Sequence, residues 1–382
     1  MTPALDLPLS LYIHIPFCLR KCPYCDFHSL AGRPAEEEYY VVRLLAELQH
    51  WRYSFHDDPR PLQSLFFGGG TPSLLKAASI ATILEGVAQL WSLTSDCEIT
   101  LEANPESCDQ EKMTDWRKAG VNRVSLGVQA LRDERLQLLG RPHDRNRALQ
   151  VIEALVQTGF HRLNVDLIYA TPGQSVEAWL GELEEAVRWG VGHLSCYALT
   201  LESGTPFHDR VAAGRWTMPN DEEGAHFFEA TRAYLAGQGF LPYEISNFAR
   251  AGHECRHNSN YWAFGDYLGV GSGAHGKWTG EDWGTLRTEN PRDLAAYMLG
   301  DFVNPASVGA EEAGLECLMM GLRMAQGMDL ERYARIRGRK WENSARGAAL
   351  VQGGLLSVEG GRLRVTPAGV SVLDAILEQL SK

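Results

Sequence analysis

The sequence lacks the features of secreted, membrane-spanning and nucleic-acid-binding proteins. No apolar run approaches the length of a bilayer span, and the N-terminal segment MTPALDLPLS has neither the basic stretch nor the apolar core of a secretory signal. Basic residues are outnumbered, with 36 Lys and Arg against 48 Asp and Glu, and the net charge of −12 disfavours nucleic acid and anionic membranes. We therefore expect a cytoplasmic protein, whose eight cysteines are metal ligands or buried thiols rather than disulfides.

Fixed-period repeats and low-complexity segments are also missing, and short apolar runs instead alternate with amphipathic stretches through the first two-thirds of the chain. Each apolar run predicts a strand and each amphipathic stretch a helix. The expected strands cover 10–15, 64–67, 97–103, 123–129, 162–169 and 193–200, and the expected helices lie near 35–53, 76–91, 109–119, 131–138, 144–158, 175–189 and 221–237. Repeated strand–helix units imply a parallel sheet covered by helices, either an open doubly wound sheet or a partial barrel.

Polar residues stand at the ends of four of these expected strands. Thr71, Glu102, Gln129 and Asp166 each lie at or just beyond the C-terminal end of a strand. Barrels and open α/β sheets place their functional sites at that edge. We therefore expect these four side chains to lie together in one site. Taken singly, a carboxylate such as Glu102 or Asp166 is equally well explained as a cap or an ion-pair partner.

The rest of the chain is expected to form a connection and a second domain. Residues 241–305 are rich in Gly, Asn, Trp and Tyr and predict an irregular connecting segment. From residue 306 two helical stretches precede a short apolar hairpin and a final helix, which is typical of a winged-helix-like α+β domain. The expected domains are therefore 1–240, 241–305 and 306–382.

Three cysteines, Cys18, Cys22 and Cys25, form a C-x3-C-x2-C motif directly after the first expected strand. Three thiolates can hold three irons of a [4Fe–4S] cluster. Because no fourth cysteine follows at a matching interval, the fourth iron would be open to an outside ligand. A tetrahedral zinc site with His14 or His28 as fourth ligand is the alternative. Zinc sites more often show a second C-x2-C or H-x3-H pair, which this sequence lacks.

The segment GGGTPS, residues 68–73, follows the second expected strand. A glycine run lets the backbone approach a ligand closely, although by itself it is also explained as a strand-to-helix turn. It has neither the lysine of a P-loop nor the spacing of a dinucleotide fingerprint. Its place beside the cysteine loop, on the same edge of the expected sheet, favours a ligand-binding role.

Together these residues resemble the radical S-adenosylmethionine (SAM) superfamily, whose cluster signature is the C-x3-C-x2-C motif. The resemblance implies a partial (β/α)6 barrel and a SAM molecule that binds the open iron through its amino and carboxylate groups. One-electron reduction would then cleave SAM to a 5′-deoxyadenosyl radical, with the cofactors supplying the chemistry. The resemblance also implies that the GGGTP segment meets the SAM amino group and that Glu102 meets the ribose.

Within the superfamily, the chain is similar to the oxygen-independent coproporphyrinogen III oxidase group over nearly its whole length. The segments YIHIPFC, FFGGGTPS, EANPE, SLGVQ and VDLIYATPGQ match in order. Carried over position by position, the resemblance implies these SAM contacts: Tyr12, Gly69, Gly70, Thr71, Glu102, Gln129, Arg141, Asp166 and Ala198. Whether they serve one SAM site or two is left open.

Two departures separate the chain from the oxidase itself. The oxidase has an extension before the first strand, which here begins by residue 10, and it has a further cysteine where this chain has Phe27. Both departures are shared with a heme-chaperone branch of the group, whose H-N-x-x-Y-W motif is matched from His257 to Trp262. The resemblance implies heme binding, with His257 as candidate ligand of the heme iron. The alternative is that His257 and Trp262 only anchor an irregular segment to the barrel.

The leading prediction is a heme chaperone that binds heme, SAM and a [4Fe–4S] cluster and transfers heme to acceptor hemoproteins. The SAM and the cluster would control heme release or docking rather than drive turnover. Two enzymes are the alternatives: an oxidative decarboxylase of coproporphyrinogen III and a radical enzyme that opens or methylates heme. We expect no nucleic-acid partner, while membrane-protein acceptors and a homodimer are left open.

Overall fold

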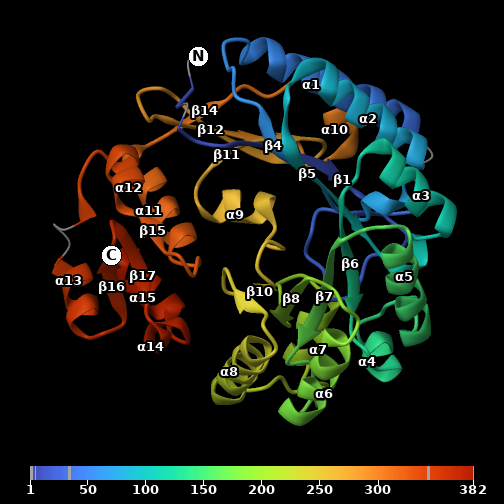
Figure 1. Ribbon diagram of the computed structural model, residues 1–382, viewed down its shortest axis with the longest axis vertical. Helices are drawn as coiled ribbons and strands as arrows, with labels where there is room; N and C mark the ends of the chain where they lie inside the picture. The colour runs from blue at the N-terminus through green and yellow to red at the C-terminus, as the bar shows by residue number, and fades with distance from the viewer. Residues whose placement is uncertain (1–2, 5, 33–35, 342–344, 382) are drawn as a thin grey trace.

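Twelve strands form one large sheet in the computed structural model, which describes residues 3–4, 6–32, 36–341 and 345–381. Their order is β14-β13-β12-β11-β1-β4-β5-β6-β7-β8-β10-β9. The six strands expected from the sequence form its middle: β1 (Leu9–Ile15), β4 (Leu62–Gly69), β5 (Leu93–Ala103), β6 (Arg123–Gln129), β7 (Arg162–Tyr169) and β8 (His193–Ala198). Each pairs in parallel with the next. The sheet curves without closing (Figure 1), which confirms the partial α/β barrel.

Helices cover the convex face of this sheet (Figure 1). Those that follow successive strands are α1 (Glu37–Ser54), α2 (Ala77–Leu90), α3 (Gln110–Ala119), α4 (Asp133–Leu138), α5 (Arg145–Gln157), α6 (Val176–Val187), α7 (Pro206–Ala212) and α8 (Asp221–Gly237). Asp109, Asp144, Ser175 and Asn220 cap four of them by accepting a backbone N–H of the first turn, which is worth about 1 kcal/mol each. None of the helices in the described part of the chain combines the length with the apolar character that a bilayer span needs.

The segment 241–305 is more regular than its sequence indicates. It contains β9 (Leu241–Pro242), β10 (Asn247–Ala249), α9 (Arg256–Trp262), β11 (Asp266–Val270), β12 (His275–Thr279), β13 (Thr285–Glu289) and α10 (Leu294–Leu299), and β14 (Ala306–Val308) follows. β11 pairs in parallel with β1, and β12, β13 and β14 extend that edge in antiparallel order. The expectation of an irregular connection is corrected here. Strands of five or fewer residues are too short to produce a clear alternating pattern.

The C-terminal residues build a second sheet with its own core. The sheet has the order β15-β17-β16. The elements of this region are α11 (Ala310–Gly321), β15 (Met328–Asp329), α12 (Leu330–Arg337), α13 (Ala345–Gln352), β16 (Leu356–Glu359), β17 (Arg362–Val365), α14 (Pro367–Val370) and α15 (Leu373–Ser381). Gly360 and Gly361, with φ of 56° and 74°, form the two-residue turn of the β16–β17 hairpin, which requires positive φ. Phe264, which follows α9, packs into this second core. The domain limits at 240 and 305 therefore stay a prediction.

Candidate functional site

The loop that carries the three cysteines is closed at its base by a short ladder. β2 (Phe17–Cys18) pairs in parallel with β3 (Leu30–Ala31), and the Gly32 N–H donates to the Cys18 carbonyl at 2.8 Å. Cys18 is buried, Cys22 and Cys25 are partly buried, and all three thiols are free. The ladder therefore holds three thiols just beyond the C-terminal end of β1.

Two side chains from other segments, one after β4 and one after α4, donate hydrogen bonds to these sulfur atoms. Thr71, just after β4, donates from Oγ1 to Cys18 Sγ at 3.5 Å, and Arg141 donates from Nη1 to Cys22 Sγ at 3.4 Å. Hydrogen bonds to sulfur tune the potential of an iron–sulfur cluster. The donor set of three thiols with two hydrogen-bonding partners fits cluster ligation.

The zinc alternative fits this geometry poorly. In the described ranges, no three His, Cys, Asp or Glu side chains converge as ligands of a single metal ion. Both ring nitrogens of His14 already form hydrogen bonds: its Nε2–H donates to the His28 carbonyl at 2.9 Å, and its Nδ1 accepts from the Tyr12 hydroxyl at 3.0 Å. The Nε2 atom of His28 lies 3.1 Å from Ser272 Oγ. A cubane takes one thiolate per iron, whereas a zinc ion needs every sulfur about 2.3 Å from one centre.

The glycine turn after β4 packs directly on β1 and on the cysteine loop. A Cβ atom at Gly68 would lie 2.8 Å from a ring carbon of Tyr12, and one at Gly70 would lie 2.7 Å from the Phe17 carbonyl oxygen. Any larger residue would push these segments apart. The glycines are therefore required by close packing, whether or not a ligand is bound.

The backbone N–H groups of this turn are all used inside the protein. Gly69 donates to Glu102 Oε2 at 3.1 Å, and Gly70 and Thr71 donate to carbonyl oxygens of β1 and β2 at 2.8 Å each. What remains for a ligand is carbonyl oxygen. Carbonyl oxygens accept hydrogen bonds, so the turn suits an ammonium group and does not suit a phosphate.

Two partly buried carboxylates, Glu102 on β5 and Asp166 on β7, lie near one another on the inner side of the barrel. Burial raises the pKa of Glu102 to about 8, the negative charge of Asp166 raises it further, and the Gly69 N–H opposes the shift. Burial also raises the pKa of Asp166, against hydrogen bonds from Ser125 at 3.2 Å and Asn164 at 2.8 Å. A cationic or hydroxyl-bearing ligand would compensate these two carboxylates.

Asn104, which the sequence reasoning missed, joins several of the expected residues. Its Nδ2 atom donates to Thr71 Oγ1 at 3.1 Å, and its Oδ1 atom accepts a hydrogen bond from Arg141. Arg141 also donates to the Gly127 carbonyl at 3.0 Å. A Cβ at Gly127 would lie 2.6 Å from Asn104 Oδ1, so this position must be glycine. The position of Asn104 in the EANPE segment, two residues after Glu102, was the available signal.

The remaining two expected SAM contacts lie at strand ends. Gln129 ends β6 with a positive φ of 71°, a conformation that is costly for a residue other than glycine and that is found at functional sites. Ala198 ends β8 and is exposed. No hydrogen bond joins the Gln129 side chain to Glu102 or Asp166 among the described residues. The structure therefore connects Tyr12, Gly69, Thr71, Glu102, Arg141 and Asp166 through contacts, and it places Gln129 and Ala198 at the same edge of the sheet.

Helix α9, which carries the H-N-x-x-Y-W motif, lies on the concave side of the sheet (Figure 1) and contacts both β4 and α11. Glu98, a buried residue of β5, holds its first turn by accepting the backbone N–H groups of Arg256 at 2.9 Å and His257 at 3.3 Å. The Cys255 thiol donates to the same carboxylate at 3.3 Å, and burial raises its pKa to about 12. Cys255 is therefore a protonated thiol.

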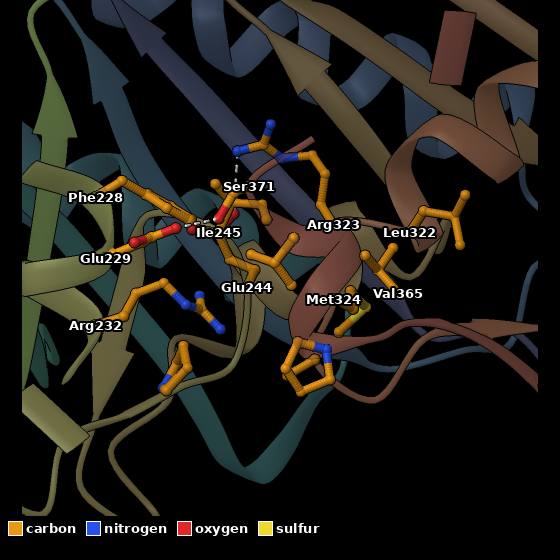
Figure 2. A pocket seen from close by; sticks show the side chains of 14 residues that line it. Phe228, Glu229, Arg232, Glu244, Ile245, Leu322, Arg323, Met324, Val365 and Ser371 are labelled. Carbon is orange, nitrogen blue, oxygen red and sulfur yellow. Dashed lines mark hydrogen bonds and ion pairs between the residues drawn. The ribbon is translucent and has the colours of Figure 1, made fainter. Parts of the chain in front are cut away.

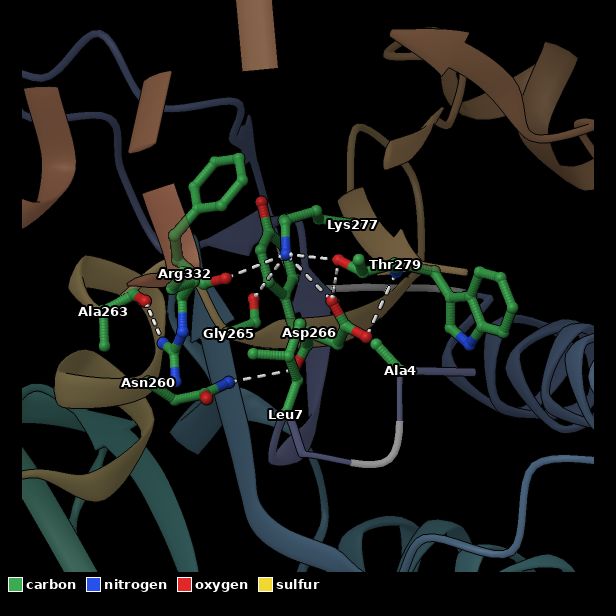
Figure 3. A network of polar contacts seen from close by, with 12 residues as sticks. Ala4, Leu7, Asn260, Ala263, Gly265, Asp266, Lys277, Thr279 and Arg332 are labelled. Carbon is green, nitrogen blue, oxygen red and sulfur yellow. Dashed lines mark hydrogen bonds and ion pairs between the residues drawn. The ribbon is translucent and has the colours of Figure 1, made fainter. Parts of the chain in front are cut away.

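The other end of α9 is held by a buried charged cluster (Figure 3). The Lys277 ammonium donates to the Phe264 carbonyl at 2.9 Å, to Asp266 Oδ1 at 2.8 Å and to Thr279 Oγ1 at 2.9 Å. Arg60 donates to the second carboxylate oxygen of Asp266 at 2.8 Å. Burial would raise the pKa of Asp266, but these two cations hold it below its usual value. The cluster joins β11, β12 and the end of α9.

The His257 ring packs against strand β4 of the barrel. Its ring stacks on Phe66 with centroids 4.9 Å apart and lies 6.2 Å from the Tyr12 ring. Burial lowers its pKa to about 3, so the imidazole is neutral. Ser64 donates its own proton to Ser10 at 2.8 Å, so at 3.2 Å its oxygen accepts the Nδ1–H of His257. This leaves Nε2 with a lone pair and without a hydrogen-bond donor among the described residues.

A chain of hydrogen bonds that the sequence does not reveal connects α9 to the carboxylate edge. Asn258 of the motif donates to the Tyr243 hydroxyl at 2.9 Å, which lies 3.0 Å from His193 Nε2. His193 Nδ1 lies 2.6 Å from Asn164 Oδ1, and Asn164 donates to Asp166 at 2.8 Å. Five side chains from four segments thus form one continuous polar path.

These features define a radical SAM protein: a partial barrel whose first strand is followed by three free thiols, with a glycine turn and two carboxylates on the same edge. The family model for the radical SAM superfamily matches residues 12–187, and the model for the HemN C-terminal domain matches residues 308–372. Within this superfamily, the chain belongs to the HemW family, as its full-length relatives show.

Curated relatives match along most of the chain. The heme chaperone HemW of Escherichia coli K12 is 40% identical over 84% of this chain and 83% of its own length. The heme chaperone HemW of Mycobacterium tuberculosis H37Rv is 36% identical over 100% and 96%. The mitochondrial radical S-adenosyl methionine domain-containing protein 1 of Bos taurus is 37% identical over 97% and 87%. The structure of coproporphyrinogen III oxidase (HemN) from Escherichia coli, a radical SAM enzyme, superposes with a TM-score of 0.81 over 98% of this chain and 90% of that one, at 22% identity, and this supports the fold.

Proposed function

We propose that this protein is a cytoplasmic heme chaperone, which binds heme and transfers it to acceptor hemoproteins under the control of a SAM-ligated [4Fe–4S] cluster. The observation that carries the proposal is the position of α9, whose His257 ring lies 6.2 Å from the Tyr12 ring at the expected SAM edge. Relatives that are named heme chaperones and match nearly the whole chain support the same function.

In this proposal Cys18, Cys22 and Cys25 bind the cluster, and SAM binds at its open iron. When bound, the two cofactors supply one-electron chemistry or a redox-sensitive state. The chain positions and shields them. The carbonyl oxygens of the glycine turn accept from the SAM ammonium group, and Glu102 accepts from a ribose hydroxyl. The full set of proposed SAM contacts is Tyr12, Gly69, Gly70, Thr71, Glu102, Gln129, Arg141, Asp166 and Ala198.

His257 is the proposed ligand of the heme iron. An iron ligand must be a neutral imidazole, and the nitrogen that binds the metal is determined by the hydrogen bond of the other nitrogen. Burial keeps the pKa of His257 near 3, and Ser64 accepts the Nδ1–H, so Nε2 is the nitrogen free to bind iron. The alternative role, anchoring of α9 to the barrel, is compatible with the same stacking on Phe66.

The hydrogen-bonded path from Asn258 to Asp166 supports control of heme by SAM. A ligand that changes the charge or position of Asp166 acts on Asn164 and His193, and through Tyr243 on the helix that carries His257. Coupling between the two ligands then requires only that α9 has a different position when SAM is bound.

Anaerobic cluster reconstitution followed by heme titration tests the proposal. The wild type is expected to give a Soret band that changes in His257→Ala, while His253→Ala, a change in the same segment, leaves the band as in the wild type. Heme should then move to an apo-hemoprotein. The absence of a Soret band in the wild type, or of any transfer, would overturn the chaperone function, whereas an unchanged band in His257→Ala removes only this ligand.

The oxidase is a second candidate, because the fold matches that of HemN and the three cluster cysteines are intact. Phe27, 64% exposed, stands where the oxidase has a further cysteine. We expect no protoporphyrinogen IX when the reconstituted protein is incubated with coproporphyrinogen III, SAM and a reductant. Formation of that product would make the chain an enzyme, and consumption of heme together with SAM cleavage would indicate a heme-modifying enzyme.

A further inference from the structure

A pocket of about 450 Å³ lies between the barrel and the C-terminal sheet (Figure 2). One wall is the face of α8 with Phe228, Glu229 and Arg232, together with the segment that follows β9. The opposite wall is the segment after α11, around Arg323, and the helix α14. Its volume falls within the range of about 300–1,000 Å³ that is typical of small-molecule sites. None of the cluster or SAM residues proposed above lines it.

The walls of this pocket are largely apolar. Phe228, Ile245, Leu322, Met324 and Val370 line it from both sides, and further apolar contacts come from prolines of β9 and α14. Such a surface favours an occupant with a flat or bulky hydrocarbon body, because each apolar contact removed from water is stabilising.

Arg232 supplies positive charge without a protein partner. No hydrogen bond or ion pair engages its guanidinium among the described residues, and the group lies 5.4 Å from the Phe228 ring centroid. Burial lowers its pKa, although the carboxylate of Glu244 partly opposes the shift. A guanidinium without a hydrogen-bond partner can pair with an anion, and its planar arrangement of N–H donors matches the two oxygens of a carboxylate.

The hydrogen bonds of the acidic side chains in the pocket go to residues other than Arg232. Glu244 accepts from the Asn247 amide at 2.6 Å and from Arg323 at 3.3 Å. Glu229 accepts from the Ser371 hydroxyl at 3.2 Å. The dashed lines in Figure 2 mark the last two of these contacts, each of which joins the barrel to the C-terminal sheet.

Two further donors beside the pocket lack an acceptor. The Nε of Arg323 and the indole Nε1 of Trp262 are buried, and neither has a hydrogen-bond partner among the described residues. The Arg323 guanidinium lies 4.3 Å from the Trp262 ring centroid. Buried donors without partners are costly, and an acceptor-bearing ligand would satisfy them. Trp262 is the last residue of the heme motif, so the pocket adjoins that motif.

We propose that this pocket binds the carboxylate edge of a flat apolar anion, with Arg232 as its ion-pair partner and the apolar walls against the hydrocarbon next to the carboxylates. The inference rests on the proposed function, because heme is then the anion and its propionates are the groups that Arg232 recognises. Arg250 and Arg256 near the motif are poorer partners: Arg256 pairs with Asp96 at 2.6 Å, and Arg250 is exposed.

Heme titration of the full-length, cluster-reconstituted protein tests this proposal. Arg232→Gln is expected to weaken heme binding about tenfold, as expected for loss of a charged hydrogen bond. Arg250→Gln is the matched control, since Arg250 also lies over a phenylalanine ring, at 4.4 Å from the Phe240 centroid, and it should bind heme like the wild type. Heme dimethyl ester, which has no carboxylates, should bind equally to the wild type and to Arg232→Gln.

The outcomes separate the two proposals. Absence of heme binding in the wild type rejects the proposed function itself. Wild-type heme binding that is unchanged in Arg232→Gln, or weakened only in Arg250→Gln, rejects the pocket and leaves the chaperone function standing. Equal weakening of heme and of its dimethyl ester in Arg232→Gln also rejects it, because the effect would then come from altered packing rather than from the lost ion pair.

Discussion

Glu98 and Arg256 connect the barrel to the helix of the heme motif: the carboxylate of Glu98 on β5 accepts the backbone N–H of Arg256 at 2.9 Å. This contact satisfies a donor in the first turn of α9, and the partial positive charge of a helix N-terminus favours the carboxylate. The same carboxylate pairs with Arg162 at 3.2 Å. The position of α9, and of His257 on it, therefore depends on a residue far away in sequence.

Glu98→Gln should lower the free energy of unfolding by about 1–3 kcal/mol, because a buried charged acceptor is lost. It should also weaken heme binding, since α9 is less firmly placed. Chemical denaturation and heme titration measure the two effects. Asp96→Asn is the control, because this exposed residue pairs with Arg256 only at the surface, and it should change both quantities little. Wild-type heme affinity in Glu98→Gln would contradict a positioning role.

Arg141→Met should leave cluster assembly intact, because all three proposed ligands remain, but should make the cluster harder to reduce. Loss of the 3.4 Å hydrogen bond and of the positive charge beside Cys22 destabilises the more negative reduced state. Spectroscopic redox titration measures the midpoint potential. Arg132→Met, a change to an arginine that pairs with Glu185 instead, is the control. An unchanged potential in Arg141→Met would show that the contact has no electrostatic influence on the cluster.

The ligand-free protein should lose stability as pH rises from about 4.5 to 8, and Glu102 should account for part of that loss. Its pKa is about 8 in the folded protein and 4.5 ordinarily, so between these values the folded state holds a proton that the unfolded state has released. Stability then falls with rising pH by as much as about 1.4 kcal/mol per pH unit. Glu102→Gln should flatten this slope in thermal unfolding, and an equal slope in both proteins would contradict the assignment.

Asp266→Ala should destabilise the protein by about 3–5 kcal/mol, because it leaves the buried Lys277 cation without a counter-charge, whereas Arg60 keeps its ion pair with Asp58. Replacement of Asp266 and Lys277 together by apolar residues should cost less than the single change, since no buried Lys277 cation then remains. Urea denaturation of both variants measures the difference. A single variant no less stable than the double variant would contradict the ion-pair account.

The central strands and their helices could be predicted from the sequence to within a few residues because each strand contains a short apolar run and each helix an amphipathic one. Strand β7, expected at 162–169, has those bounds, and helix α8 spans the expected 221–237. The cysteine loop, the glycine turn and the two carboxylates were also recognisable, because the residue types and their spacing are local properties of the chain.

Contacts between distant segments could not be predicted in this way. Strand β11 joins the sheet beside β1, and its short sequence gives no sign of that partner. Glu98 reads as one polar residue in a strand, although it holds the start of α9. Asn164 and Tyr243 acquire their roles only when the fold brings them to His193. The free guanidinium of Arg232 is likewise visible only once α8 faces the C-terminal sheet.

Transfer of heme from the loaded protein to an acceptor tests the central claim most directly. The cluster-reconstituted chain is loaded with one equivalent of heme, separated from free heme and mixed anaerobically with an apo-hemoprotein, while the Soret bands of donor and acceptor are followed. The account predicts that the donor band declines as the acceptor band rises, with total heme conserved. Retention of heme by the chain, or its consumption with SAM cleavage, would contradict the account.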